Sequence, residues 1–334
     1  MVIVYLLMHR VPMLLIAVAA LLIVTPVIGY RPRPELKPKR SQNLVSSSKL
    51  DDIRYHMGPV LTADITIHPI WYGAWQNSQK NIIREFIYSI SAVHSKHPSV
   101  AEWWETVQLY TDKTGANVSR KVLLAEENDS FYSHGKSLTR SSMQYVIRSA
   151  VTAGAKPLLI TKSGLYLLLT SPDVHVQDFC NHICGFHNLT WKSIVGYTLL
   201  YAWVGNSGKL FPQTCAFPFA VPEYMAGFKA LKPPNGDVGV DGMISFIGHE
   251  VAELATDPVG NAWYSGQEPS LPLESADICE GIYGTGDDVP YTGHVLKGKD
   301  GATYNMNGIK RRYLVQWAWN YVVSACTGPN ALDQ

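Results

Sequence analysis

The stretch ISFIGHEVAELATDP, residues 244–258, decides both the expected fold and the expected site. Its apolar residues recur at helical spacing, from Met243 just before it to Leu254 near its end, and this pattern predicts one helix. Asp241 stands ahead of the stretch as an N-cap, and Pro258 closes it. The helix is otherwise hydrophobic, so its acidic residues crowd onto a narrow stripe.

Side chains on this stripe suggest metal chemistry. His249 and Glu253 are four residues apart, so they project from one face of the helix about one turn apart. An imidazole and a carboxylate in this arrangement can hold a zinc-type ion, and Glu250 beside the first ligand could act as a general base. The spacing is that of the His-Glu-x-x-His metallopeptidase helix, with glutamate replacing the second histidine. A third ligand is expected from Glu274 or Asp277, which follow in the chain.

The same residues also fit an ordinary helix whose acidic side chains face solvent. A carboxylate in place of imidazole adds negative charge and weakens the acidifying effect of an ion on bound water, which argues against catalysis. Ligation rich in carboxylates suits calcium as well as zinc, and Asn235 and Asp237 add further oxygens. Metal binding is therefore a hypothesis here, with zinc and calcium both open as the ion.

Length and composition describe a globular chain with a large core. It has 334 residues, of which 46% are hydrophobic and 16% are charged. The formal net charge is +1, and the sequence has no helix-turn-helix or zinc-finger pattern. We therefore exclude nucleic acid as an expected partner.

The N-terminus predicts entry into the secretory pathway. Residues 11–29 form an apolar run preceded by His9 and Arg10, which predicts a signal peptide over residues 1–29. An uncleaved membrane anchor is the alternative, because nineteen residues could just span a bilayer. After cleavage no membrane partner is expected. Residues 30–54, rich in proline, serine and basic groups, predict a linker, and residues 55–334 predict a single domain.

Glycosylation sequons and cysteines agree with an extracellular location. Three acceptor sequons begin at Asn117, Asn128 and Asn188. All five cysteines lie in the C-terminal half, at positions 180, 184, 215, 279 and 326. In an oxidising compartment they should form two disulfides and leave one thiol. Zinc bound by Cys180, His182, Cys184 and His187 is the alternative, although their spacing departs from the usual two-residue knuckle.

Strand and helix patterns alternate from about residue 58. Strands are predicted over 65–72, 118–125, 165–170, 195–204 and 313–319, helices over 79–93 and 138–151, and a hairpin turn over 299–302. Pro69 would force the first strand to an edge position or a bulge. The layout predicts an α/β fold with a mixed sheet and flanking helices. Its element order is also that expected of a zincin-type, metallopeptidase-like core.

Six separate blocks carry a resemblance to a known family. They are residues 70–75 (IWYGAW), 110–112 with 114–118, 178–180 with 184–187, 201–208 (YAWVGNSG), 234–242 (PNGDVGVDG) and 248–258. Together they resemble the plant EXORDIUM, or phosphate-induced protein 1, family from about residue 57 to 333.

The resemblance implies a location and a process. It implies a secreted protein of the plant apoplast and cell wall that promotes cell expansion and growth, linked to brassinosteroid and to nutrient or carbon status. No reaction of the family is established, so a non-enzymatic wall or signalling protein stands beside a metal-dependent extracellular hydrolase of the peptidase type. Cell-wall polysaccharide or an extracellular protein is the expected partner. Trp71, Trp75, Trp103 and Trp104 could stack on sugar rings, although aromatic residues more often fill the core.

The cysteine pattern departs from the family. Members commonly carry a cysteine where this chain has Phe211, which accounts for the odd cysteine count. The resemblance implies that Cys279 and Cys326 can pair, and that one of Cys180, Cys184 and Cys215 keeps a free thiol.

Overall fold

The computed structural model describes residues 53–181, 183–225, 227–266, 272–286 and 292–332. The predicted signal peptide and residues 30–52 of the predicted linker lie outside these ranges. Among the described residues, no helix is both long enough and apolar enough to cross a membrane. The single domain expected over residues 55–334 stays a prediction.

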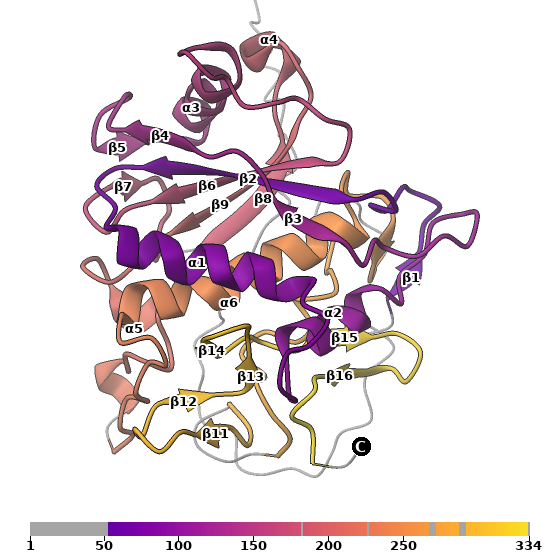
Figure 1. Ribbon diagram of the computed structural model, residues 1–334, viewed down its shortest axis with the longest axis vertical. Helices are drawn as coiled ribbons and strands as arrows, with labels where there is room; N and C mark the ends of the chain where they lie inside the picture. Colours follow the sequence, from indigo (N-terminus) through magenta and orange to yellow (C-terminus); the bar gives the residue numbers. More distant parts are fainter. Residues whose placement is uncertain (1–52, 182, 226, 267–271, 287–291, 333–334) are drawn as a thin grey trace, which may run out of the picture.

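The central sheet combines six strands in the order β3-β2-β6-β9-β8, with β4 also paired to β2 (Figure 1). These strands are β2 (Ile65–Tyr72), β3 (Val122–Leu124), β4 (Asn128–Phe131), β6 (Gly164–Thr170), β8 (Gly185–Leu189) and β9 (Leu200–Gly205). All neighbours run parallel except β8, which lies antiparallel to β9 at one edge. The predicted mixed α/β fold is confirmed, whereas the zincin-type core stays a prediction.

Helices cover both faces of the sheet (Figure 1). On one face lie α1 (Asn77–Ile90), α2 (Val100–Val107) and α6 (Val238–Thr256), and on the other lie α3 (Arg140–Thr152) and α4 (Lys192–Val195). The β6 residues Leu165, Leu167 and Leu169 join the first core, and Tyr166 and Leu168 join the second. This double burial explains why β6 is an uninterrupted apolar run.

Short elements complete the fold. They are β1 (Arg54–Tyr55) with β10 (Trp263–Tyr264), β5 (Ser137–Leu138) with β7 (His175–Val176), β11 (Leu296–Lys297) with β12 (Thr303–Tyr304), β13 (Met306–Asn307) with β14 (Arg312–Tyr313), β15 (Ala318–Asn320) with β16 (Ala325–Thr327), helix α5 (Pro212–Cys215) and the 3-10 turn η1 (Glu223–Met225). The hairpin turn predicted over 299–302 is confirmed between β11 and β12.

Strand β2 lies inside the sheet, so the prediction that Pro69 would force an edge position was wrong. The Ile65 N–H and the Ile67 carbonyl both bond toward β3. Because alternate residues of a strand bond to the same side, Pro69 faces the break between the end of β3 and the start of β4. No ladder hydrogen bond is lost there. The pairing with β4 is irregular only further on, at Trp71 and Tyr72.

Helix α6 starts earlier than predicted. Asp237, rather than Asp241, is the N-cap, and its carboxylate accepts a hydrogen bond from the Val240 N–H at 3.0 Å. The helix ends at Thr256, shortly before Pro258, as predicted. Nearly every residue of α6 is buried, including its acidic ones, so the alternative of a solvent-facing acidic stripe was wrong.

Three predicted strands are shorter than expected. Only residues 122–124 of the segment 118–125 pair as β3. In the segment 195–204, Gly196 adopts φ +90° at the end of α4 and delays the strand to Leu200. The segment 313–319 divides between β14 and β15, because the backbone N–H groups between them bond elsewhere. The Val315 N–H, for example, donates to the Asn305 side chain.

The cysteines form two disulfides, Cys184–Cys215 and Cys279–Cys326, and leave Cys180 as a buried thiol. This confirms the predicted pairing of Cys279 with Cys326 and the predicted free thiol. It excludes Cys184 as a zinc ligand, and the other proposed ligand His182 lies outside the described residues. The Cys180 sulfur lies 3.1 Å from the Cys215 sulfur. It also lies 3.5 Å from the carbonyl of Leu210, next to Phe211, where the resemblance implies a further cysteine.

Candidate metal centre

A cluster of imidazoles and carboxylates lies between α6, the edge strand β8 and the segment that follows β10. Helix α6 supplies His249, Glu250 and Glu253 from its central turns, because i and i+4 residues share one face. Strand β8 contacts α6 and supplies His187. The predicted metal ligands from beyond the helix, Glu274 and Asp277, arrive on the segment after β10. Segments distant in sequence thus meet at one buried point.

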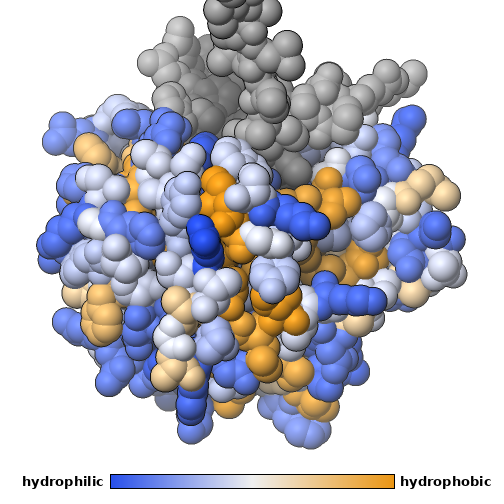
Figure 2. Space-filling model, turned by 90° about the horizontal axis from the view of Figure 1, so that it is seen from above, coloured by the Kyte–Doolittle hydropathy of each residue, from blue (hydrophilic) through white to orange (hydrophobic). Residues whose placement is uncertain are grey.

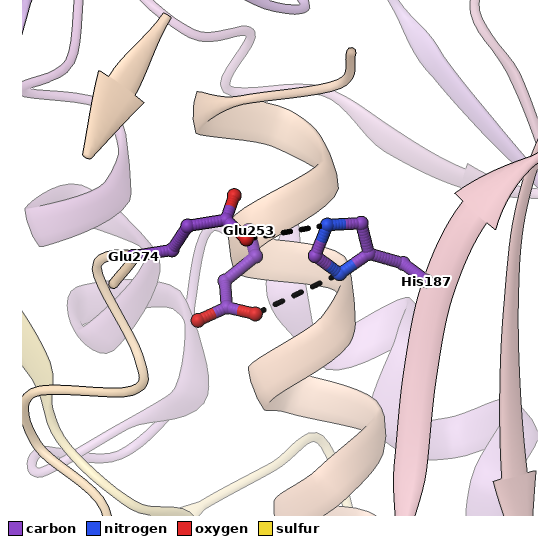
Figure 3. A group of neighbouring side chains, drawn as sticks. All are labelled: His187, Glu253 and Glu274. Atoms are coloured by element: carbon purple, nitrogen blue, oxygen red, sulfur yellow. Dashed lines mark ion pairs between the residues drawn. The ribbon is translucent and has the colours of Figure 1, made fainter. Parts of the chain in front are cut away.

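His187 lies between two carboxylates (Figure 3). Its Nε2 is 3.4 Å from Glu274 Oε2, and its Nδ1 is 3.6 Å from Glu253 Oε2. One donor atom from each of these three residues lies within 4.8 Å of the others. All three side chains are at most 1% exposed. The side chains are of the types that ligate metal ions, and the two carboxylates face different nitrogens of the ring.

The predicted ligand His249 forms a second such group with Glu253 and Asp277. His249 Nε2 lies 3.1 Å from Glu253 Oε2 and 3.4 Å from Asp277 Oδ1. The structure therefore brings together all four residues predicted as ligands, with Glu253 common to both groups and Glu274 in the group of His187. Their binding of a metal stays a prediction.

Glu250, the predicted general base, turns toward β8. Its Oε2 lies 3.0 Å from His187 Nδ1, and the side chain is fully buried. Gly185 on β8 leaves room for it, because a Cβ there would lie 2.9 Å from Glu250 Oε1. Glu250 thus serves as a hydrogen-bond partner of His187. An acid paired in this way with a metal-ligating histidine fixes the ring and its tautomer.

Backbone hydrogen bonds hold the ligand segment against α6. Glu253 Oε1 accepts the N–H groups of Ala276 at 3.3 Å and Asp277 at 3.0 Å. Asp277 Oδ2 accepts the N–H of Glu274 at 3.0 Å. Because one oxygen of Glu253 is committed to this segment, only Oε2 is left to face the two imidazoles.

Gln316 completes the surroundings of His249. Its amide Nε2 donates to the Ala276 carbonyl at 2.7 Å and lies 3.0 Å from His249 Nδ1. Sequence analysis missed both Gln316 and the role of His187. In the sequence, His187 stood out only as a member of the cysteine–histidine segment 180–187. No sequence pattern pointed to Gln316.

The cluster is strongly acidic for a buried site. Burial, and next the charge of Asp277, raise the pKa of Glu253 to about 7. Burial, and next the charge of Glu253, raise the pKa of Glu274 well above its ordinary range. Burial opposes the charged form of His187, but the hydrogen bond with Glu250 and the surrounding carboxylates raise its pKa. These carboxyl groups can stay together in the interior only with added protons or a cation.

The site is closed to solvent. His187, His249, Glu250 and Glu253 are essentially unexposed, and the Asp277 side chain, at 14%, is the most exposed of the cluster. A catalytic metal site keeps an open coordination position for water or substrate, and the burial of these side chains limits the access of a substrate to any ion held here.

The chain is thus a disulfide-containing mixed α/β protein with a buried imidazole–carboxylate cluster. The family model described as "Phosphate-induced protein 1 conserved region" matches residues 53–329. The chain therefore belongs to the phosphate-induced protein 1, or EXORDIUM, family.

Among its relatives is protein EXORDIUM-like 3 of Arabidopsis thaliana, 62% identical over 98% of this chain and 100% of the relative. Protein EXORDIUM-like 5 of Arabidopsis thaliana is 52% identical over 90% and 85%. Protein PHOSPHATE-INDUCED 1 of Nicotiana tabacum is 36% identical over 85% and 90%. No solved structure matches the chain.

Proposed function

We propose that this chain is a secreted protein of the plant cell wall and apoplast that promotes cell expansion, and that its fold encloses a divalent cation. Membership of the EXORDIUM family supports the growth role that the resemblance implies. The apolar N-terminal run and the two disulfides support an extracellular location.

One observation supports the proposed divalent cation. The predicted ligands His249, Glu253, Glu274 and Asp277 converge with His187 in a closed interior cluster. Within the described part of the chain, the ion pairs of these carboxylates are all with the two histidines. Burying several uncompensated carboxylates costs several kcal/mol each, on the order of the whole stability of a domain. A divalent cation would supply the positive charge in place of the protons that the raised pKa values of Glu253 and Glu274 otherwise bring into the cluster.

The metal content of the secreted mature protein, purified without chelators, tests the cation. We expect about one ion per chain in the wild type, since at least three ligands converge, and loss of that ion in His249→Ala/Glu253→Ala. The matched control is His97→Ala/Glu126→Ala, which removes the same two residue types where they are exposed. Absence of stoichiometric metal from the wild type would contradict the proposed cation.

Plants that overproduce the protein test the growth role. Overproduction of the wild type should lengthen cells, and the metal-free variant should lengthen them less if the cation maintains the folded protein. Cell lengths equal to those of untransformed plants would contradict the proposed role in expansion.

The alternative of a metal-dependent hydrolase fits the geometry less well. A general base must reach a metal-bound water, yet Glu250 is fully buried and bonded to His187. The burial of the cluster also limits the access of a substrate to the ion. Hydrolysis of a peptide by the wild type that Glu250→Gln abolishes would restore this alternative.

Cell-wall polysaccharide is the partner that we propose for the surface. Trp71, Trp103 and Trp104 lie in the core and cannot stack on sugars. Figure 2, seen from the end that carries α3 and α4 in Figure 1, shows hydrophobic residues grouped among hydrophilic ones. Trp191 and Tyr197, which flank α4, are among the exposed aromatic residues of this chain. Pectin or xyloglucan binding that Trp191→Ala/Tyr197→Ala weakens would support this partner, and unchanged binding would contradict it.

A further inference from the structure

We infer that Asn117 carries an N-linked glycan in the secreted protein, and that the other two acceptor asparagines, Asn128 and Asn188, do not. This inference rests on the proposed extracellular location, because N-glycans are attached to chains that enter the secretory pathway. All three asparagines stand in complete acceptor sequons. The structure separates them by the surroundings that each side chain faces.

The attachment replaces one hydrogen of the asparagine amide. The donor is an oligosaccharide joined to a lipid diphosphate. A bond forms between Nδ2 and C1 of the first sugar, while the bond from C1 to the diphosphate oxygen breaks and the lipid diphosphate leaves with its electrons. One Nδ2 proton passes to a base of the transferring enzyme. The modified nitrogen keeps one N–H, so it can still donate one hydrogen bond, but the bulky sugar needs open space.

Asn117 meets both requirements. It is exposed and lies in a segment, residues 110–118, that folds back on itself with Thr111 as its bridge partner. Its Nδ2 donates to the carbonyl of Gln108, the C-cap residue of α2, at 2.7 Å. This is the one hydrogen bond of that nitrogen among the described residues, so one of its two hydrogens is left for the sugar. The turn is open, because apart from chain neighbours no described atom lies within 4 Å of the place that a Cβ would take at Gly115.

The hydroxyl residues of the sequons show when a glycan must be added. Ser119, which completes the Asn117 sequon, is buried, and its Oγ accepts a hydrogen bond from the Lys121 N–H at 3.1 Å. Thr190, which completes the Asn188 sequon, is buried as well. The transferring enzyme needs this serine or threonine, so it must act before the chain folds. Folding then decides at which asparagines the native structure tolerates a glycan.

Asn128 faces a covered side of the central sheet. It lies in β4 opposite Ile70 of β2, and Ile70 packs in the core on the α3 side. The next residue, Asp129, faces the other side, where it pairs with Lys80 of α1. Asn128 is half-buried, and its Oδ1 accepts a hydrogen bond from Ser130 Oγ at 2.6 Å. A glycan there would push against α3, which contacts β4.

Asn188 faces the same covered side. It lies in β8 opposite Tyr201 of β9, whose buried ring packs in the core on the side of α3 and α4. Residues opposite each other in an antiparallel pair share one face of the sheet, so the half-buried Asn188 faces this layer as well. Val195 of α4 packs in the same core. A bulky sugar on Asn188 would compete with this packing.

Site mapping on the wild-type protein tests the inference and needs no variant to fold. The protein is produced in plant cells and collected from the medium. A peptide N-glycosidase that accepts plant glycans, used in heavy-oxygen water, converts each glycosylated asparagine to labelled aspartate. Mass spectrometry of the peptides should find the label at residue 117 and unlabelled asparagine at residues 128 and 188. Secreted protein with no label at Asn117, or with label at Asn128 or Asn188, would overturn the inference.

Matched variants give a second readout on a denaturing gel. Asn117→Gln should migrate like the enzyme-treated wild type, whereas Asn128→Gln and Asn188→Gln should migrate like the untreated wild type. Ser119→Thr keeps the sequon and should keep the glycan. A glycan retained by Asn117→Gln, or lost from Asn128→Gln or Asn188→Gln, would contradict the assignment. Protein that stays inside the cell without a glycan would refute the proposed extracellular location and the glycan with it, whereas secreted protein lacking the label at Asn117 refutes the glycan alone.

Discussion

The Cys279–Cys326 disulfide holds the segment that supplies two carboxylates to the cluster. Cys279 follows Asp277 by two residues, and Cys326 lies in β16. The double variant Cys279→Ala/Cys326→Ala removes this link without touching a proposed ligand. It therefore tests how strongly the ligand segment depends on a covalent anchor.

The expected cost follows from the loop that the disulfide closes. The two cysteines are 47 residues apart in sequence. The loss of chain entropy on closing such a loop corresponds to about 4 kcal/mol at 25 °C. We expect the double variant to lose about this much free energy of unfolding. Its cation affinity should also fall, because the freed segment carries Glu274 and Asp277.

Urea unfolding followed by tryptophan fluorescence measures the effect, in metal-free and zinc-loaded protein. Cys180→Ala is the control, since it removes a buried thiol that closes no loop, and it should cost about 1 kcal/mol. A loss below about 1 kcal/mol in the double variant would refute the reasoning, since a loop of this length is worth several times more. The hydrogen bonds from Ala276 and Asp277 to Glu253 would then suffice to hold the segment.

Three further predictions concern the site and the core. In metal-free protein, the raised pKa of Glu253, about 7, means that the folded state binds a proton more tightly than the unfolded chain. Stability measured by urea unfolding should therefore fall as pH rises from about 4.5 to 7, and Glu253→Gln should reduce this slope. Gly185→Ala places a methyl group against Glu250 and the Trp203 carbonyl. It should lower the free energy of unfolding by about 1–3 kcal/mol and lower the metal content. A variant with wild-type stability and metal content would contradict this packing. Leu168→Ala removes a fully buried side chain of β6 and should lower the free energy of unfolding by about 2–5 kcal/mol in the same assay. A loss under about 1 kcal/mol would contradict the burial of Leu168 in the core.

Local patterns predicted the parts of the site that lie close in sequence. Helical spacing placed His249 and Glu253 on one face, and the acidic segment after the helix supplied Glu274 and Asp277. His187 lies 63 residues from its partner Glu250, and Gln316 lies 67 residues from His249. The approach of His187 depends on β8 being the antiparallel edge strand beside α6, and that of Gln316 depends on the segment between β14 and β15 returning to α6. Both are properties of the chain topology and not of any local pattern.

The fold was predictable wherever burial imposed a period on the sequence. Strand β6 is apolar throughout because both its faces are covered, and α1 shows a regular apolar stripe. Pro69 led to a wrong prediction of an edge strand, because it lies opposite the break between β3 and β4, where its missing N–H costs no ladder hydrogen bond. Around Val315, apolar residues suggested a strand, yet a side-chain amide from Asn305 takes the place of a neighbouring strand. In both cases a distant partner, absent from the local sequence, decides the outcome.

The position of Cys180 beside the Cys184–Cys215 disulfide bears on how well that pairing persists. A thiol 3.1 Å from a disulfide sulfur is placed for exchange, but only the ionised thiolate attacks. Burial raises the pKa of Cys180 to about 12. About one such thiol in 100,000 is then ionised at pH 7. The apolar packing around Cys180 thus slows disulfide shuffling and preserves the native connectivity without any need to keep the sulfurs apart.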